Sequence, residues 1–353
     1  MKKTYNKNKR KKWNRSKTKK VLKKRRNKRL FNPLRQRLYI YNNNREEYIL
    51  RDTIIAPDNI SLLDNTEKCI AFFDEIRSDK NISKVGRRCF VETSLLNVIK
   101  VDYSTICILL AIIRDLKSKG INFRTDFPND DKCKNWIINS GLLNFMYDSN
   151  GRPFKKSEES ELFFIEKGSK KLTKEDNIRI SETVKKVMEY LTGKNQHCKK
   201  LRTILLEICG NSIEWGGTKN KQWLFGIKYD GEQVIFTITD VGRGILKSLN
   251  RKFKIRLQEA FIGIGDDNIL KGAFVKKYGS SSQQVNRNKG LPAIKNGYDI
   301  GLLRNLNVLT NNVILNYQDD SRSRVIKGKE FNGTLYRWVV TGESVKKFVN
   351  GNN

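Results

Sequence analysis

Two carboxylates and an amide form a narrow stripe on an otherwise apolar segment, "LLEICGNSIEWGG" at residues 205–217. In an α-helix, at about 100° per residue, Glu207, Asn211 and Glu214 fall at positions i, i+4 and i+7, within one arc. Apolar side chains flank that arc on both sides, whereas a surface helix has one broad polar face. Because burying unpaired polar groups is costly, we expect something polar to lie against this stripe.

The residue types in the stripe suit phosphate chemistry. The amide oxygen of Asn211 is a hard ligand that suits Mg²⁺, which keeps most of its waters and takes few protein oxygens. Glu207, one turn earlier, can orient or deprotonate the group that attacks a γ-phosphate. Glu214 is interpreted instead as a solvated acid at the helix end.

The motif "DVGRG" follows an expected strand. The carboxylate of Asp240, at the strand end, can accept a hydrogen bond from the exocyclic amine of a base. Gly242 and Gly244 allow the backbone to approach a ligand and to turn without a Cβ clash. By itself such a pentad is often only a turn, so its weight comes from the motifs around it.

Two further motifs follow, "RNKGL" and "NGTLYRW". Lys289 and Gly290 come after a polar stretch that is either an ordinary loop or a segment that closes over phosphates with its backbone N–H groups. Thr334 starts the last expected strand, and its hydroxyl can reach the Asp240 end. The order of the four motifs predicts a nucleotide site.

This order resembles the GHKL family, the Bergerat-fold ATPases that include gyrase, the Hsp90 chaperones, MutL and the histidine kinases. The resemblance covers about residues 180–342, with "LLEICGNSIEWG", "DVGRGI", "NKGL" and "GT" similar to the family's successive motifs. It implies that Glu207 is the catalytic carboxylate, that Asn211 binds magnesium and that Asp240 reads the adenine of ATP. It also implies that the pocket is lined by Gly242, Gly244 and Gly290.

Two departures from the family pattern are visible. Trp215 stands where kinases of the family often have histidine, and the lid has one clear glycine, Gly290. The single histidine, His197, is interpreted as a residue near a helix start, not as a phosphoacceptor. A glutamate four residues before the asparagine suits serine kinases of the anti-sigma type and the ATPases.

The elements that must position these residues indicate an α/β protein of two domains. The chain has 353 residues, of which 38% are hydrophobic and 31% charged, which is enough for two cores. Strands alternating with helices predict a small α/β domain at 38–149, followed by a polar linker at 150–177. A C-terminal α/β sandwich with a mostly antiparallel or mixed sheet is expected at 178–345, and a tail at 346–353.

The clearest strand pair lies directly after the stripe. Apolar residues alternate from Trp223 to Tyr229 and again from Val234 to Ile238, with Asp230-Gly231 between them. This pattern predicts a hairpin with a type I′ turn. Two more strands are expected at "NNVILNY" and "GTLYRWVV".

The N-terminal domain resembles the STAS domain, the anti-sigma-antagonist fold, over about residues 50–148. The segment "VDYSTICILLAIIRDLKSKG" has a strand, an Asp-Tyr-Ser turn and a helix expected from Ser104 to Gly120. The resemblance implies that Ser104 is a candidate phosphoacceptor. The alternative is that Ser104 is simply the helix N-cap.

Charge is concentrated at the start of the chain. Residues 1–37 contain 19 basic and no acidic side chains, while the remainder has 52 basic against 37 acidic ones. Such a segment does not fold alone, and its interleaved aromatic residues suit RNA or DNA as a partner. A solubilising extension is the alternative.

No apolar run approaches the ~20 residues that span a bilayer, so no membrane contact is expected. The six cysteines form no CxxC pair, as in buried thiols of a reducing compartment. We therefore expect a cytoplasmic protein that binds ATP and Mg²⁺.

The function remains open among three classes. The first is ATP hydrolysis or serine/threonine phosphoryl transfer, and the second is an ATP-switched module that binds a protein partner through the STAS-like domain. The third is a nucleic-acid-associated ATPase of a defence or repair type. The sequence leaves homodimer formation open.

Overall fold

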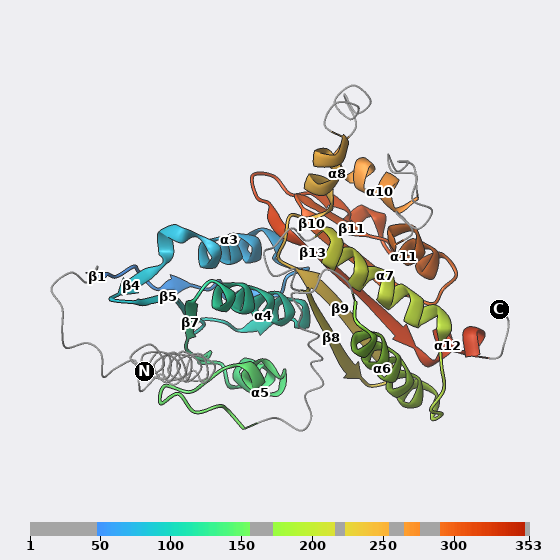
Figure 1. The fold of residues 1–353 in the computed structure, drawn as a ribbon, viewed down its shortest axis with the longest axis horizontal. Coiled ribbons are helices and arrows are strands. Elements are labelled where there is room, and N and C mark those ends of the chain that lie inside the picture. Colours follow the sequence, from blue (N-terminus) through green and yellow to red (C-terminus); the bar gives the residue numbers. More distant parts are fainter. Residues whose placement is uncertain (1–47, 156–171, 216–222, 254–264, 276–289, 350–353) are drawn as a thin grey trace, which may run out of the picture.

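The computed structural model describes residues 48–155, 172–215, 223–253, 265–275 and 290–349 (Figure 1). Only the backbone is described at 48, 211–215, 250–253 and 349. These residues form a mixed α/β structure with two main sheets. The basic segment 1–37 lies outside the described residues.

The N-terminal half is built around strand β5, a seven-residue strand that pairs with three others. It pairs in parallel with β2 and β7 and antiparallel with β4, and β1 continues from β4. Its elements are β1 (Tyr48–Ile49), β2 (Ile54–Ile55), β3 (Asn59–Ile60), α3 (Thr66–Arg77), β4 (Ser83–Val85), β5 (Arg88–Ser94), β6 (Lys100–Val101), α4 (Tyr103–Ser118), β7 (Ile121–Thr125) and α5 (Asp131–Asn139). The expected small α/β layer is therefore present in the described residues.

Helix α4 is capped by a different residue from the one expected. Asp102 is the N-cap, because its carboxylate accepts from the backbone N–H of Thr105, and the helix begins at Tyr103. Ser104 lies inside the first turn and is 1% exposed. The prediction of Ser104 as N-cap was wrong, since a carboxylate two residues earlier is the stronger acceptor for a first-turn N–H.

The C-terminal half is built on a six-stranded sheet in the order β12-β11-β10-β13-β9-β8, and every neighbouring pair is antiparallel. Its elements are α6 (Lys174–Thr192), α7 (Lys199–Trp215), β8 (Trp223–Asp230), β9 (Gln233–Asp240), α8 (Ile245–Phe253), α10 (Asp266–Phe274), α11 (Gly290–Asp299), β10 (Arg304–Asn311), β11 (Val313–Asn316), β12 (Arg324–Val325), β13 (Phe331–Thr341) and α12 (Gly342–Val349). The antiparallel sheet agrees with the sequence prediction.

The hairpin of β8 and β9 is confirmed, but with a different turn. Asp230 pairs with Gln233, so Gly231 and Glu232 are the two central residues. Gly231 has φ +61°, whereas Glu232 is not among the described residues with positive φ. A type I′ turn requires positive φ at both central positions, so the expected turn type was wrong.

Two boundaries differ from those expected. Helix α6 starts at Lys174, where Thr173 and Asp176 form a capping box, so the linker ends before 177. Helix α12 extends the C-terminal half to Val349, four residues beyond the expected domain end. At α6, capping geometry rather than apolar periodicity sets where the helix begins.

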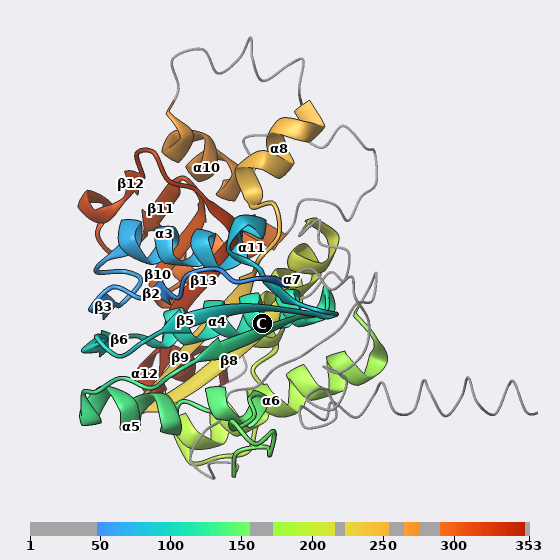
Figure 2. The same ribbon diagram turned by 90° about the vertical axis from the view of Figure 1, so that its left-hand side faces the viewer.

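The six-stranded sheet is covered on both faces (Figures 1 and 2). Helices α6 and α7 pack against one face, and α4 of the N-terminal half packs against β8, β9 and β13 on the other. Helix α4 also contacts β7, so it lies between the two sheets. Only Arg114, Lys117 and Ser118 of its 16 residues are not fully buried, which explains why its sequence is apolar all round.

The two halves therefore share a core. One buried cluster combines residues of α3 and α4 with Leu224, Leu309 and Leu335 of the C-terminal sheet. Among the described helices, none is long and apolar enough to cross a membrane. The six cysteines are all free thiols.

Helix α4 and the sheet are in close contact at Gly226. A Cβ there would lie 2.7 Å from the Cys107 Sγ and 3.0 Å from the Tyr103 hydroxyl, and that hydroxyl donates to the Ile227 carbonyl at 2.8 Å. We expect Gly226→Val to lower the free energy of unfolding by about 1–3 kcal/mol through overpacking. Urea unfolding of the full chain measures the loss.

The matched control is Gly210→Ala, at a helical glycine whose added Cβ meets nothing within 4 Å. Its stability should be equal to or above that of the original protein, since alanine favours a helix. If Gly226→Val unfolds at the same urea concentration as the original protein, α4 does not pack on β8 as described.

Candidate functional site

Strand alternation places three residues at one end of the sheet and on one face. Phe236 and Ile238 of β9 belong to the buried cluster that contains Ile208 of α7, so the next residue on that face is Asp240. Thr334 of β13 and Trp223 of β8 are the cross-strand neighbours of Asp240. The predicted proximity of Thr334 and Asp240 is confirmed.

Helix α7 covers this face and carries the predicted stripe. Ile204 and Ile208 are fully buried against the sheet, while Glu207 is half-buried. Asn211 lies one turn later in the same helix, but its side chain is outside the described residues. The helical placement of the Glu207–Asn211 pair is confirmed.

The loop after Asp240 has the backbone geometry that its glycines suggest. The Gly242 N–H donates to Asp240 Oδ1 at 2.9 Å, which folds the loop back onto the carboxylate. Gly244 has φ +80°, and a Cβ there would lie 2.4 Å from Asn311 Oδ1. Both the conformation and the close approach require glycine at 244.

Two side chains of β10 hold this loop and the start of α8. Thr310 Oγ1 accepts from the Ile245 N–H at 2.8 Å, and Asn311 Oδ1 accepts from the Leu246 N–H at 3.0 Å. The Asn311 amide donates to the Arg243 carbonyl at 2.8 Å. Asn311 is 1% exposed and has φ +53°, so it is a structural anchor of the loop.

Sequence reasoning missed Thr310 and Asn311 because it did not identify β10. Leu306, Val308 and Leu309 form a short, buried apolar run, which was an available strand signal. Nothing local indicated that Asn311 would reach the 243–246 backbone, since that contact spans 65 residues.

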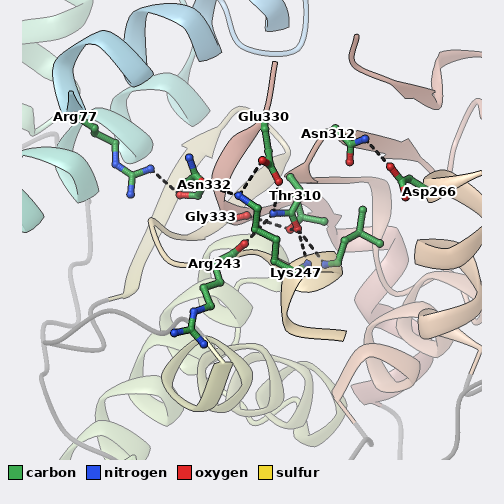
Figure 3. Close-up of polar contacts among 11 residues, drawn as sticks. Arg77, Arg243, Lys247, Asp266, Thr310, Asn312, Glu330, Asn332 and Gly333 are labelled. Atoms are coloured by element: carbon green, nitrogen blue, oxygen red, sulfur yellow. Dashed lines mark hydrogen bonds and ion pairs between the residues drawn. The ribbon is translucent and has the colours of Figure 1, made fainter. Parts of the chain in front are cut away.

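A charged cluster lies beside the loop (Figure 3). Lys247 of α8 contacts Glu330 Oε2 at 2.8 Å and donates to Asn332 Oδ1 at 2.9 Å. Burial raises the pKa of Asp74 on α3, and nearby Arg77 opposes that rise. Figure 3 shows the Arg243 side chain pointing away from this cluster, with only its carbonyl engaged.

The helix after the predicted lid begins at Gly290, which is buried. This helix, α11, packs on α7 through Gly297, where a Cβ would lie 2.4 Å from Ile204 Cδ1. The lid helix is therefore adjacent to the helix that carries Glu207. Lys289 lies outside the described residues.

Ser104 belongs to a different part of the molecule. It lies on α4, across the six-stranded sheet from α7, and its buried hydroxyl has no hydrogen-bond partner among the described residues. Phosphorylation of Ser104 would therefore require α4 to move.

Asp240, Thr334 and the Gly242–Gly244 loop form a polar strand end on the face of the sheet that α7 covers. No group of three His, Cys, Asp or Glu side chains in the described ranges could hold a metal ion alone. A separate hollow of about 670 Å³ is lined by residues of α10, α11, β11 and the segment after β11, including Lys271, Lys295 and Tyr317. Among the predicted site residues that the structure describes, none lines it.

No protein-family model matches the sequence, and no curated protein shows significant similarity to it.

Proposed function

We propose that the C-terminal half binds Mg-ATP at the strand end formed by Asp240 and Thr334, in the manner of a GHKL ATPase. The observation that carries this proposal is the arrangement of three sequence-predicted motifs around one sheet end. Asp240 and Thr334 are cross-strand neighbours, the glycine loop folds onto the Asp240 carboxylate, and α7 covers the same face.

Each residue has a role that its environment supports. Asp240 is 3% exposed, so its carboxylate can accept from the exocyclic amine of adenine with little competition from water. Thr334, 4% exposed, adds a hydroxyl beside it. Glu207 is half-buried on α7 and is the general base, while Asn211 and Lys289 are assigned to Mg²⁺ and the phosphates by resemblance.

We propose ATP hydrolysis or serine/threonine phosphoryl transfer as the use of this site. Mg²⁺ would neutralise developing charge on the phosphates, and Glu207 would orient and deprotonate the attacking water or hydroxyl. The alternative is an ATP-driven switch, which the packing of the STAS-like half directly on the C-terminal sheet favours.

Calorimetric titration of the full chain with ATP in the presence of Mg²⁺ tests the proposal. Inosine triphosphate, which lacks the 6-amino group, is the matched ligand. We expect ATP to bind more tightly than inosine triphosphate by about tenfold, the difference that one buried hydrogen bond to a charged group makes. Absence of ATP binding would refute the proposal.

A second candidate function is association with RNA or DNA through the basic residues 1–37. The observation is their 19 positive and zero negative side chains. We expect affinity to fall with salt at a log–log slope of about −0.7 to −0.9 per phosphate neutralised. Deleting 1–37 should remove most of that binding without changing ATP affinity.

Filter binding of the full-length and truncated chains over a salt series measures this effect. Equal slopes and affinities for the two chains would assign nucleic-acid contact to the remaining +15 charge of the chain.

A further inference from the structure

Arg77, in the last turn of α3, extends from the N-terminal half to the strand ends of the C-terminal sheet. Its Nη1 donates to the Asn332 carbonyl at 2.7 Å (Figure 3), and its Nη2 donates to the Val241 carbonyl at 2.8 Å. Burial lowers the pKa of Arg77, and the charges of Asp115, Asp74 and Asp240 oppose that shift. An arginine nevertheless stays protonated, so a half-buried cation lies close enough to Asp240 for their charges to interact.

The two carbonyls belong to the backbone that sets the position of Asp240. Val241 directly follows Asp240. Asn332 is two residues before Thr334, which is the cross-strand neighbour of Asp240. Between them, Gly333 packs so tightly that a Cβ would lie 2.2 Å from the Asp240 carbonyl oxygen. The guanidinium thus joins the end of β9 to the start of β13, beside the close approach of Gly333 to the Asp240 carbonyl.

We propose that Arg77 is a positioning residue for the nucleotide site, which makes α3 of the N-terminal half part of that site. The inference rests on the proposed ATP function. By holding both strand ends, Arg77 fixes the direction in which the Asp240 carboxylate meets the base. Binding of ATP and docking of the N-terminal half are therefore coupled, and each strengthens the other.

Arginine suits this role better than lysine. Its planar fork donates two hydrogen bonds in fixed directions, whereas a lysine ammonium is a single point charge on a flexible stem. Arg77→Lys keeps the charge near Asp240 but cannot hold both carbonyls in the same geometry. The pair of variants Arg77→Ala and Arg77→Lys thus separates charge from positioning.

The experiment compares the affinities of the full chain for ATP and inosine triphosphate by calorimetry. We expect Arg77→Ala to reduce the ratio of the two affinities by about tenfold, the loss of one charge-assisted hydrogen bond to the base. Affinity for inosine triphosphate should stay within about twofold, since that ligand lacks the amine that Asp240 reads. Arg77→Lys should restore only part of the preference for ATP that Arg77→Ala loses.

The matched control is Arg324→Ala. Arg324 also bridges the halves, through Thr66 Oγ1 at 3.3 Å and Glu67 Oε1 at 3.5 Å, but it lies on β12, away from Asp240. In Arg324→Ala, the ratio of the affinities for ATP and inosine triphosphate should equal that of the original protein. If Arg77→Ala keeps the original ratio, or if both variants weaken the two ligands equally, Arg77 has no positioning role.

Failure of the ATP proposal itself gives a different result. In that case neither the original chain nor Asp240→Asn distinguishes the two nucleotides, and the coupling proposal is refuted with it. Hydrogen exchange without nucleotide then still reports whether Arg77→Ala loosens the amides of 241–244 and 333–334. Unchanged exchange there would refute even the structural clamp.

Discussion

Replacing Asp240 by asparagine is expected to lower the affinity for ATP by about 100-fold and to abolish the preference over inosine triphosphate. A carboxylate accepts hydrogen bonds at both oxygens, and one of them already accepts from the Gly242 N–H. Asparagine accepts at one oxygen only. In the variant, either the Gly242 N–H or the adenine amine faces the side-chain NH₂ group, which is also a donor. Position 240 is 3% exposed, so little water is available to compensate for the lost hydrogen bond. Calorimetry with both nucleotides measures the two effects.

Asp230→Asn is the control for this change. Asp230 ends β8 just as Asp240 ends β9, but at the opposite end of the hairpin, and it is exposed. The same chemical substitution there should leave both affinities unchanged. If Asp240→Asn binds ATP as tightly as the original chain, the base is read elsewhere and the site assignment fails.

The parts of this site that the sequence predicted are local. The stripe of Glu207 and Asn211 lies on a helix because its apolar residues recur at helical spacing. The β8–β9 hairpin follows from strict alternation around a glycine turn. The positive φ of Gly244 could be inferred from its place in the sequence, since a turn between a strand and a helix often needs a residue with positive φ.

The parts that the sequence did not predict depend on distant contacts. Asn311 anchors the glycine loop from 65 residues away, and Arg77 reaches Val241 across 164 residues. No local pattern distinguishes either residue from an ordinary polar side chain. Helix capping failed for a related reason, because Asp102 and Ser104 are both good N-caps and tertiary packing buries Ser104.

The N-terminal half illustrates a further limit of sequence reasoning. Its apolar helix α4 suggested an independent domain core, but one of its faces packs on the C-terminal sheet. A helix that is apolar on all sides is expected to be buried, but its sequence does not show which elements bury it. Because the two halves share a core, the apolar residues of α4 form part of the core of both halves.

Replacing Glu207 by glutamine should leave ATP binding nearly unchanged and lower turnover by about 10²- to 10⁴-fold. Glutamine has the same shape, so it can still direct a water molecule, but it cannot take a proton. Glu207 is half-buried on the helix that covers the Asp240 face, where a carboxylate can reach a group near the phosphates without holding the base. Release of phosphate under single-turnover conditions, with calorimetry in parallel, separates chemistry from binding.

Glu182→Gln is the matched control, because Glu182 lies on the neighbouring helix α6, where its exposed side chain forms an ion pair with Lys185. That variant should turn over ATP at the original rate. Equal turnover by Glu207→Gln and the original chain would remove Glu207 from the chemistry. If the original chain binds ATP yet shows no hydrolysis or phosphoryl transfer, the switch function is favoured, and coupling through Arg77 then becomes the main consequence of nucleotide binding.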